Sequence, residues 1–151
     1  MNNRIVMNTQ LPEGITLSLL QRALEVTFDT QKAQLDGQVH VSFVTKAESR
    51  HINSSNTGND YPTDVLSLSY PVEKHEKGLA AAEIIICTPI ARLQAKQYNV
   101  SLQEEICLLF VHGLLHTLGN DHQTLQDQQK YQQAQNAIMK KLNLTARNMP
   151  W

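Results

Sequence analysis

The sequence predicts a single domain of the α+β (α/β) class, with a small mixed sheet of about four strands flanked by helices. The chain has 151 residues, a length that suits one domain with one hydrophobic core. Short apolar runs typical of strands are interspersed with segments of helical periodicity, an order that favours a mixed architecture. The segment EEICLLFVHGLLHTLG (104–119) carries apolar side chains around its whole circumference, which predicts a central buried helix.

In the first half of the chain we expect three strands, at residues 4–8, 39–45 and 65–70. Thr16 is a suitable N-cap for a helix whose apolar residues recur at helical spacing as far as Phe28. The segment 52–64 is rich in Asn, Ser and Gly and contains Pro62, a composition typical of a loop.

In the second half, the polar segment 71–78 predicts a loop, and the β-branched run 81–88 predicts another strand. Helices are expected from Pro89 to Tyr98, from the capping box of Ser101 and Glu104, and from Thr124 to Leu142. In the last helix the packing face is expected to contain Leu125, Ala134, Ile138 and Leu142. The tail 145–151 carries no structural signal, and no repeat or linker divides the chain.

Charge and hydropathy exclude several classes of protein. Lys and Arg number 13 against 14 Asp and Glu, and the net charge of −1 argues against strong non-specific binding to nucleic acid. No apolar run approaches the roughly 20 residues that cross a bilayer. The first residues lack the apolar core of a signal peptide, so we expect a cytoplasmic protein with no membrane partner. Cys87 and Cys107 lie in apolar stretches and are expected to be reduced core residues.

Three of the six histidines fall between residues 112 and 122. His112 and His116 are four residues apart, so they project side by side from a helix. Gly119 suits the left-handed turn that ends a helix, and such a turn can bring His122 back towards the other two. The spacing therefore predicts a metal site of three imidazoles. Its open position would hold a zinc-bound water, as in catalytic rather than structural zinc sites.

The same helix bears on a fourth ligand and on a protease alternative. Cys107 faces away from both helical histidines, whereas Cys87 lies elsewhere in the chain and stays open as a ligand. Metalloproteases of the H-E-x-x-H class carry their general base beside the first ligand, where this chain has Gly113, so a protease is disfavoured. The remaining histidines are expected to be surface residues: His40, His51 and His75.

Two blocks of the sequence resemble the YbeY family of metal-dependent endoribonucleases. The family motif H-G-x-L-H-L-x-G-Y-D-H matches HGLLHTLGNDH (112–122), and the block D-x-P-T-D-V-L-S-F matches DYPTDVLSL (60–68). The resemblance implies one YbeY-like zinc hydrolase domain over residues 1–151. It also implies one Zn²⁺ per chain, held by His112, His116 and His122 beside a cleft that the 52–64 loop borders.

The resemblance further implies a zinc-dependent, single-strand-specific endoribonuclease that acts in 16S rRNA 3′-end maturation and in ribosome quality control. Its implied partners are ribosomal RNA and the small ribosomal subunit, and DNA is not expected. Two alternatives stay open, a non-catalytic ribosome-associated metal-binding factor and a metallohydrolase of another substrate.

The chain departs from the family pattern next to the second block. The family usually carries L-N-x-x-Y-R there, and this chain has INSSNT (52–57), so that Thr57 stands in place of the arginine. The family's L-G-D-I block is likewise AAEI (81–84). A guanidinium can grip a phosphate bidentately, whereas a threonine hydroxyl carries no charge. Lys46 and Arg50 are the nearest cations in sequence, and both are expected to be solvated surface charges.

Four residues of this region are candidates for positioning a substrate: Asn53, Thr57, Asp60 and Asp64. The two aspartates and the asparagine can equally be turn residues. Asp121, which precedes the last predicted ligand, either orients an imidazole from behind or shapes the turn at GND.

Overall fold

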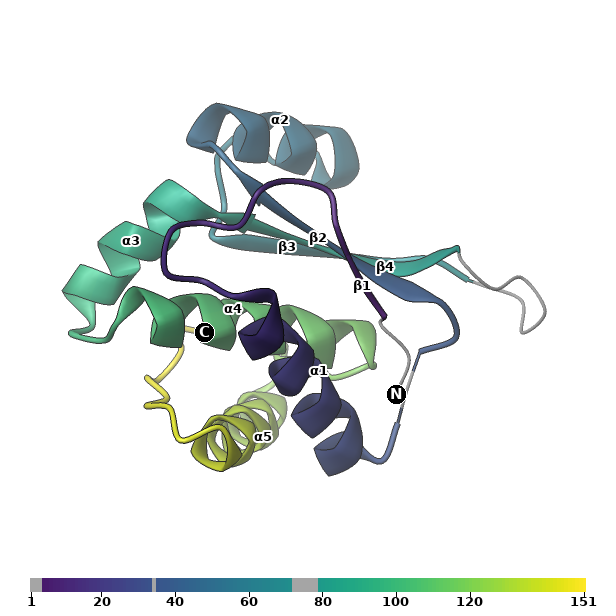
Figure 1. Cartoon of the computed structure of the whole chain (residues 1–151), viewed down its shortest axis with the longest axis vertical. Helices are drawn as coiled ribbons and strands as arrows, with labels where there is room; N and C mark the ends of the chain where they lie inside the picture. The colour runs from purple at the N-terminus through teal and green to yellow at the C-terminus, as the bar shows by residue number, and fades with distance from the viewer. Residues whose placement is uncertain (1–3, 34, 72–78) are drawn as a thin grey trace.

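A computed structural model describes residues 4–33, 35–71 and 79–151 of the chain (Figure 1). Over these residues the chain forms a mixed sheet with helices on both faces, and the predicted α+β class is confirmed. Residues 72–78 of the predicted loop 71–78, among them His75, lie outside the described residues.

The strands follow the predicted segments to within one residue at each end. They are β1 (Ile5–Met7), β2 (Gln38–Val44), β3 (Val65–Ser69) and β4 (Ala80–Cys87). The order across the sheet is β1-β2-β4-β3, in which β2 is parallel to β1 and to β4, and β3 is antiparallel to β4. The parallel pair β1 and β2 is joined by a helical crossover, as parallel strands require.

The helices are α1 (Leu17–Gln31), α2 (Lys46–Thr57), α3 (Thr88–Gln97), α4 (Leu102–Thr117) and α5 (Leu125–Lys141). The predicted N-caps of α1, α4 and α5 are confirmed, because each side chain accepts a backbone hydrogen bond from the first turn. The capping box of Ser101 and Glu104 is present, with the Glu104 carboxylate accepting the Ser101 N–H at 3.0 Å.

The prediction of a loop over 52–64 is wrong in its first part, because residues 46–57 form α2. Asn and Ser are weak helix formers, so the composition of this segment is typical of a loop although both ends of the helix are well specified. At its start Thr45 and Glu48 form a capping box, and at its end Gly58 adopts a left-handed φ of 81°. The loop is therefore confined to residues 58–64.

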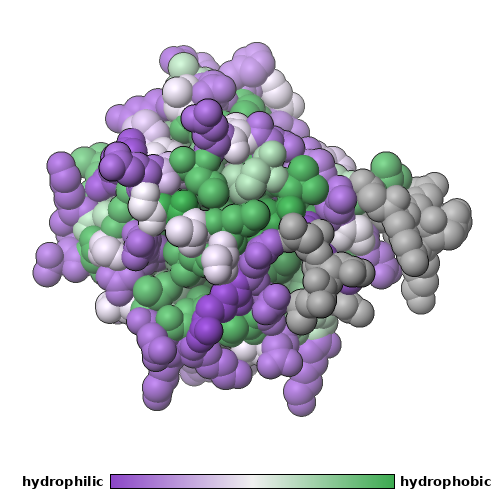
Figure 2. All heavy atoms as spheres, viewed as in Figure 1, coloured by the Kyte–Doolittle hydropathy of each residue, from purple (hydrophilic) through white to green (hydrophobic). Residues whose placement is uncertain are grey.

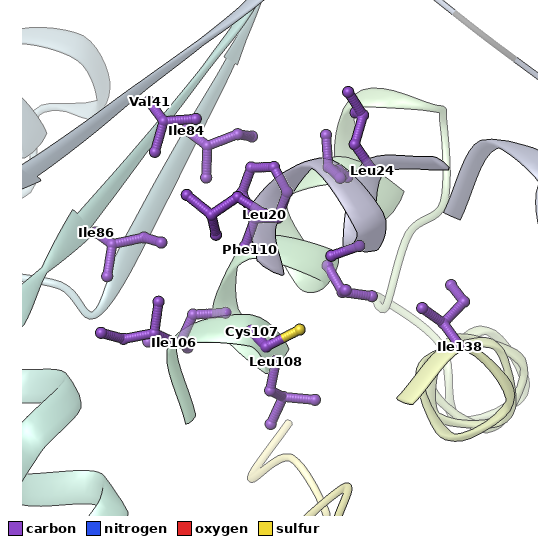
Figure 3. Packing of buried hydrophobic residues seen from close by; sticks show 14 of the residues in the cluster. Leu20, Leu24, Val41, Ile84, Ile86, Ile106, Cys107, Leu108, Phe110 and Ile138 are labelled. Carbon is purple, nitrogen blue, oxygen red and sulfur yellow. The ribbon is translucent and has the colours of Figure 1, made fainter. Parts of the chain in front are cut away.

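The hydrophobic core lies on both faces of the sheet, since the side chains of β4 alternate between them. Ile84 and Ile86 belong to the larger cluster, which contains residues of α1, α4 and α5. Ile85 and Cys87 belong to a smaller cluster, against which Ile52 of α2 packs. Figure 3 shows part of the larger cluster, and Figure 1 shows α4 and α2 on opposite sides of the sheet. The predicted histidine helix, α4, is thus buried against one face of the sheet, and α2 covers the other face.

The packing face of α5 begins later than predicted. Leu125 is 73% exposed, so its predicted place in that face is wrong, because the first turn of α5 precedes the part of the helix that reaches the core. Ile138 and Leu142 are buried as expected, and Ala134 is partly buried against them. Tyr131 and Gln135 are buried on the same face.

The outer surface is polar around its edges. Figure 2 shows hydrophilic side chains along the outline of one side of the molecule and hydrophobic side chains towards its middle. Among the described residues, no helix combines the length and the apolar character that a membrane span requires.

Candidate metal centre

The turn after α4 brings His122 back towards His112. Gly119 adopts a φ of 97°, the left-handed conformation that its position predicts. Its N–H donates to the carbonyl of His116 at 3.1 Å, one of the hydrogen bonds of a Schellman turn. As a result the ring centroids of His112 and His122 lie 5.8 Å apart. The glycine turn therefore does what the spacing of the motif predicts for these two residues.

The ring of His112 is oriented by α5. Its Nδ1 lies 2.6 Å from Oε1 of Gln135. Because an amide oxygen only accepts hydrogen bonds, the proton of the neutral ring lies on Nδ1, and Nε2 carries the lone pair. Burial lowers the pKa of His112 to about 4, although the hydrogen bond to Gln135 acts in the opposite direction. His112 is therefore neutral at pH 7, the form of imidazole that binds metals.

Four aromatic rings gather around this point: His112, His122, Tyr131 and Trp151. The Tyr131 ring stacks on His112 at a centroid distance of 4.7 Å, and its hydroxyl donates to the His112 carbonyl. The Trp151 indole lies 5.1 Å from His122 and 5.9 Å from His112. The histidines are thus flanked by α5 and by the C-terminal tail.

The donor set suits a transition metal in its chemistry. Imidazole nitrogen is a common zinc ligand, and a ligating histidine usually donates its other N–H to an oxygen, as His112 does to Gln135. His116 is exposed one helical turn beyond His112. In the part of the chain that the structure describes, no three His, Cys, Asp or Glu side chains are arranged as a metal site as they stand. The histidines fit a metal in donor type and in the protonation of His112, but the three rings do not converge on one point.

Gly113, between the two helical histidines, faces the sheet. A Cβ atom at this position would lie 3.1 Å from Cδ1 and 3.2 Å from Cγ2 of Ile84. The glycine therefore permits the close approach of α4 to β4. A glutamate here would point into the core, which agrees with the sequence argument against a metalloprotease.

Neither cysteine belongs to the histidine cluster. Cys107 is fully buried in the larger core cluster (Figure 3), where burial raises the pKa of its thiol to about 12. Cys87 is buried in the cluster on the other face of the sheet, together with Val44 and Ile85. Both are free thiols in the core, as predicted, and the structure gives Cys87 no place beside the histidines.

The candidates near the second block lie on α2 and the loop after it. Arg50 forms an exposed ion pair with Asp60, with Nε 2.8 Å from Oδ1, so this cation is already paired at the surface. The Asn53 amide donates to the Tyr61 carbonyl at 2.9 Å, and the Thr57 hydroxyl hydrogen-bonds to Asn53 at 2.8 Å. These contacts fold the loop onto α2. Among the described residues, none of the four positioning candidates hydrogen-bonds to a histidine of the motif.

Asp64 belongs instead to a buried polar network that the sequence did not reveal. Its Oδ2 accepts from Gln94 at 3.3 Å, and Gln94 donates to Glu105 at 2.7 Å. Glu105, on α4, forms a bidentate ion pair with Arg147, with both nitrogen–oxygen distances 2.6 Å. Burial raises the pKa of the Asp64 carboxyl, and the N–H of Val65 opposes this shift. The network connects the loop, α3, α4 and the C-terminal tail.

Asp121 takes the turn role of the two that its position predicts. Its Oδ1 accepts the backbone N–H of His122 at 2.8 Å. Within the described part of the chain, its carboxylate has no hydrogen bond to an imidazole. It therefore fixes the backbone of His122 rather than the ring.

The sequence carried a signal for some of the residues that it did not identify. Glu105 stands in a helix that is otherwise apolar all round, and a buried charge of this kind needs a partner. Gln135 occupies the apolar face of α5 four residues after Tyr131, a polar residue where the periodicity favours an apolar one. No pattern in the tail identifies Trp151, whose place depends on tertiary contacts alone.

Comparison of the sequence with known proteins shows to which family the chain is similar. The family model described as Endoribonuclease YbeY matches residues 5–143 of the chain. An endoribonuclease YbeY of Pelotomaculum thermopropionicum is 34% identical over 137 residues, which cover 88% of this chain and 90% of that protein. One of Staphylococcus aureus strain Newman is 33% identical over 145 residues, covering 91% of this chain and 94% of its own length.

A solved structure agrees with the fold. The solution structure of a Thermotoga maritima protein superposes with a TM-score of 0.55 at 24% sequence identity, covering 92% of this chain and 91% of the other. The family model and both relatives match most of the chain and lead to one assignment. The chain belongs to the endoribonuclease YbeY family.

Proposed function

We propose that this protein is a zinc-dependent endoribonuclease that cleaves single-stranded ribosomal RNA. The observation that carries the proposal is the pair of His112 and His122, brought together by the Gly119 turn, with His112 kept neutral by its burial and its ring oriented by Gln135. Relatives that match most of the chain are named endoribonucleases, which supports RNA as the substrate.

His112, His116 and His122 would hold the zinc ion. Since the lone pair of His112 lies on Nε2 and its pKa is low, no proton has to leave it when a metal binds at pH 7. For the other two rings, binding would require a turn of the side chain, which is available to His116 because it is exposed. A zinc ion supplies Lewis acidity, which offsets the negative charge that develops on a phosphodiester during hydrolysis.

The finer roles rest on the family resemblance. We propose 3′-end maturation of 16S rRNA and ribosome quality control as the processes served, the small ribosomal subunit as the partner and the cytoplasm as the location. The net charge of −1 disfavours binding through many phosphate contacts, so this assignment requires that other contacts select the substrate.

One observation favours a second candidate, a non-catalytic ribosome-associated metal-binding factor. Thr57 replaces the family arginine, and Arg50 is engaged with Asp60. Phosphodiester cleavage without a guanidinium loses a charge-assisted contact to the phosphate. This candidate shares the metal site but predicts no cleavage.

The test is cleavage of a single-stranded RNA that carries the 3′ end of 16S rRNA. Purified protein loaded with zinc should cut it, and a chelator should abolish the cutting. His116→Ala should lose both zinc and activity, whereas the matched variant His51→Ala, at an exposed histidine of α2, should keep both. Zinc binding without cleavage would favour the non-catalytic factor, and cleavage of another substrate class would favour a different metallohydrolase.

A further inference from the structure

The C-terminal tail places a large aromatic surface beside the histidine pair. The Trp151 indole lies 5.1 Å from the His122 ring and 5.3 Å from that of Tyr131, and 38% of its surface is exposed. A buried aromatic of this size would be ordinary core. Because part of the indole is exposed next to a candidate nuclease site, a flat ligand can bind against it.

The tail is anchored, so the position of the indole is defined. The Arg147 guanidinium forms the buried bidentate ion pair with Glu105 and lies 4.0 Å over the ring centroid of Tyr98. Two residues further on, the N–H of Met149 donates to Oε1 of Gln132 at 2.9 Å. These contacts hold the chain against α4 and α5 up to the residues just before the tryptophan.

We propose that Trp151 is a stacking platform for an unpaired base of the RNA substrate. This inference rests on the proposed function and adds to it a residue that selects single strands. Bases in a duplex are stacked on each other, and only an unpaired base can turn its face to an indole. The indole lies 5.1 Å from the His122 ring, so a base stacked on it would lie near this histidine.

The charge of the chain gives stacking a large share in the binding. The 13 Lys and Arg residues are offset by 14 Asp and Glu, and the exposed Arg50 is paired with Asp60, so the chain has no net positive charge with which to attract phosphates. Stacking on an aromatic ring contributes to binding without neutralising a phosphate, so the binding free energy from stacking does not fall as the salt concentration rises.

Trp151 is the only tryptophan in the sequence, so its fluorescence reports on the platform directly. Addition of a single-stranded oligonucleotide to the zinc-loaded protein should quench this fluorescence, and the duplex of the same sequence should not. Binding measured by anisotropy of a labelled oligonucleotide should weaken about fivefold to a hundredfold in Trp151→Ala. Trp151→Phe should retain most of the affinity, because a phenyl ring still stacks. The loss in Trp151→Ala should be the same at low and at high salt.

Two controls separate this inference from the proposed function. Leu93→Ala removes an exposed apolar side chain of α3 outside the ring cluster and should bind as the wild type does. The zinc content of every variant should be unchanged. If the wild type cleaves single-stranded RNA and Trp151→Ala binds it equally well, the platform is refuted while the proposed function stands. If Trp151→Ala binds or cleaves better than the wild type, the indole covers the site instead. If the wild type binds no single-stranded RNA, both proposals fail.

Discussion

Removal of Arg147 should destabilise the protein far more than removal of a surface arginine. Arg147 is 7% exposed and Glu105 is fully buried, and their two hydrogen bonds are each 2.6 Å long. In Arg147→Met the Glu105 carboxylate stays buried, and among the described residues the Gln94 amide, 2.7 Å away, is the donor that remains. Leaving one charge of a buried pair without its partner costs about 3–5 kcal/mol. That is a large part of the 5–15 kcal/mol by which a typical domain is stable.

The matched control is Arg50→Met. Arg50 and Asp60 form an ion pair of the same chemical type, with a nitrogen–oxygen distance of 2.8 Å, but their side chains are 57% and 67% exposed. Exposed pairs contribute about 0–1 kcal/mol, so this variant should lose little. The two substitutions delete the same side chain from an ion pair of the same type, one buried and one exposed, and Arg147→Met also loses the contact with the Tyr98 ring.

The assay is urea unfolding at pH 7, followed by circular dichroism, with the free energy of unfolding taken from the midpoint and slope. The double variant Glu105→Leu with Arg147→Met should recover most of the loss, because no charge is then left buried. The reasoning is refuted if Arg147→Met loses no more stability than Arg50→Met. It is also refuted if the double variant is as unstable as the sum of its two single variants.

Three further predictions concern the histidine helix and its surroundings. Gln135→Leu should weaken zinc binding about tenfold to a hundredfold by removing the acceptor of His112 Nδ1. In a zinc titration the exposed Gln133→Leu should match the wild type, and equal affinities in all three proteins would exclude the orienting role of Gln135. Gly113→Ala should lower the urea midpoint, because overpacking against Ile84 costs about 1–3 kcal/mol. This cost outweighs the roughly 1 kcal/mol by which alanine stabilises a helix relative to glycine. A raised midpoint would mean that Ile84 moves aside at little cost. In metal-free protein His112 takes up a proton with its ordinary pKa of about 6.5 in the unfolded state, but only with a pKa of about 4 in the folded state. The free energy of unfolding therefore decreases as the pH falls from 6.5 to 4, because the unfolded state binds this proton first. The free energy of unfolding should be about 2 kcal/mol lower at pH 5 than at pH 7 on account of this group, and His112→Asn should show no such component; an equal slope in both proteins would contradict the burial of a neutral ring.

The regular elements of the fold could be predicted because local signals decide them. Thr16, Ser101 and Thr124 mark helix starts through hydrogen bonds within one turn, and the strands are short apolar runs with clear ends. Helix α2 was missed because the segment 52–57 has a loop-like composition. The capping box of Thr45 and Glu48, which specifies the helix, lies upstream of that segment.

The site was predictable only where the motif itself fixes the geometry. The spacing of His112, Gly119 and His122 depends on one helix and one turn, and the sequence was sufficient to pair these two histidines. Gln135 and Trp151 reach His112 and His122 from elements packed by tertiary contacts, which no local pattern encodes. The same holds for Arg147, whose partner Glu105 is 42 residues away in the chain.

The most direct test of the central claim is a zinc titration of metal-free protein during cleavage of the 16S rRNA 3′-end substrate. We predict no cleavage before zinc is added, a rise in rate with each increment, and saturation at one zinc per chain. His116→Ala should stay inactive throughout the titration, whereas His51→Ala should follow the wild type. Full activity in metal-free protein, or a normal titration by His116→Ala, would contradict a zinc-dependent site built on these histidines.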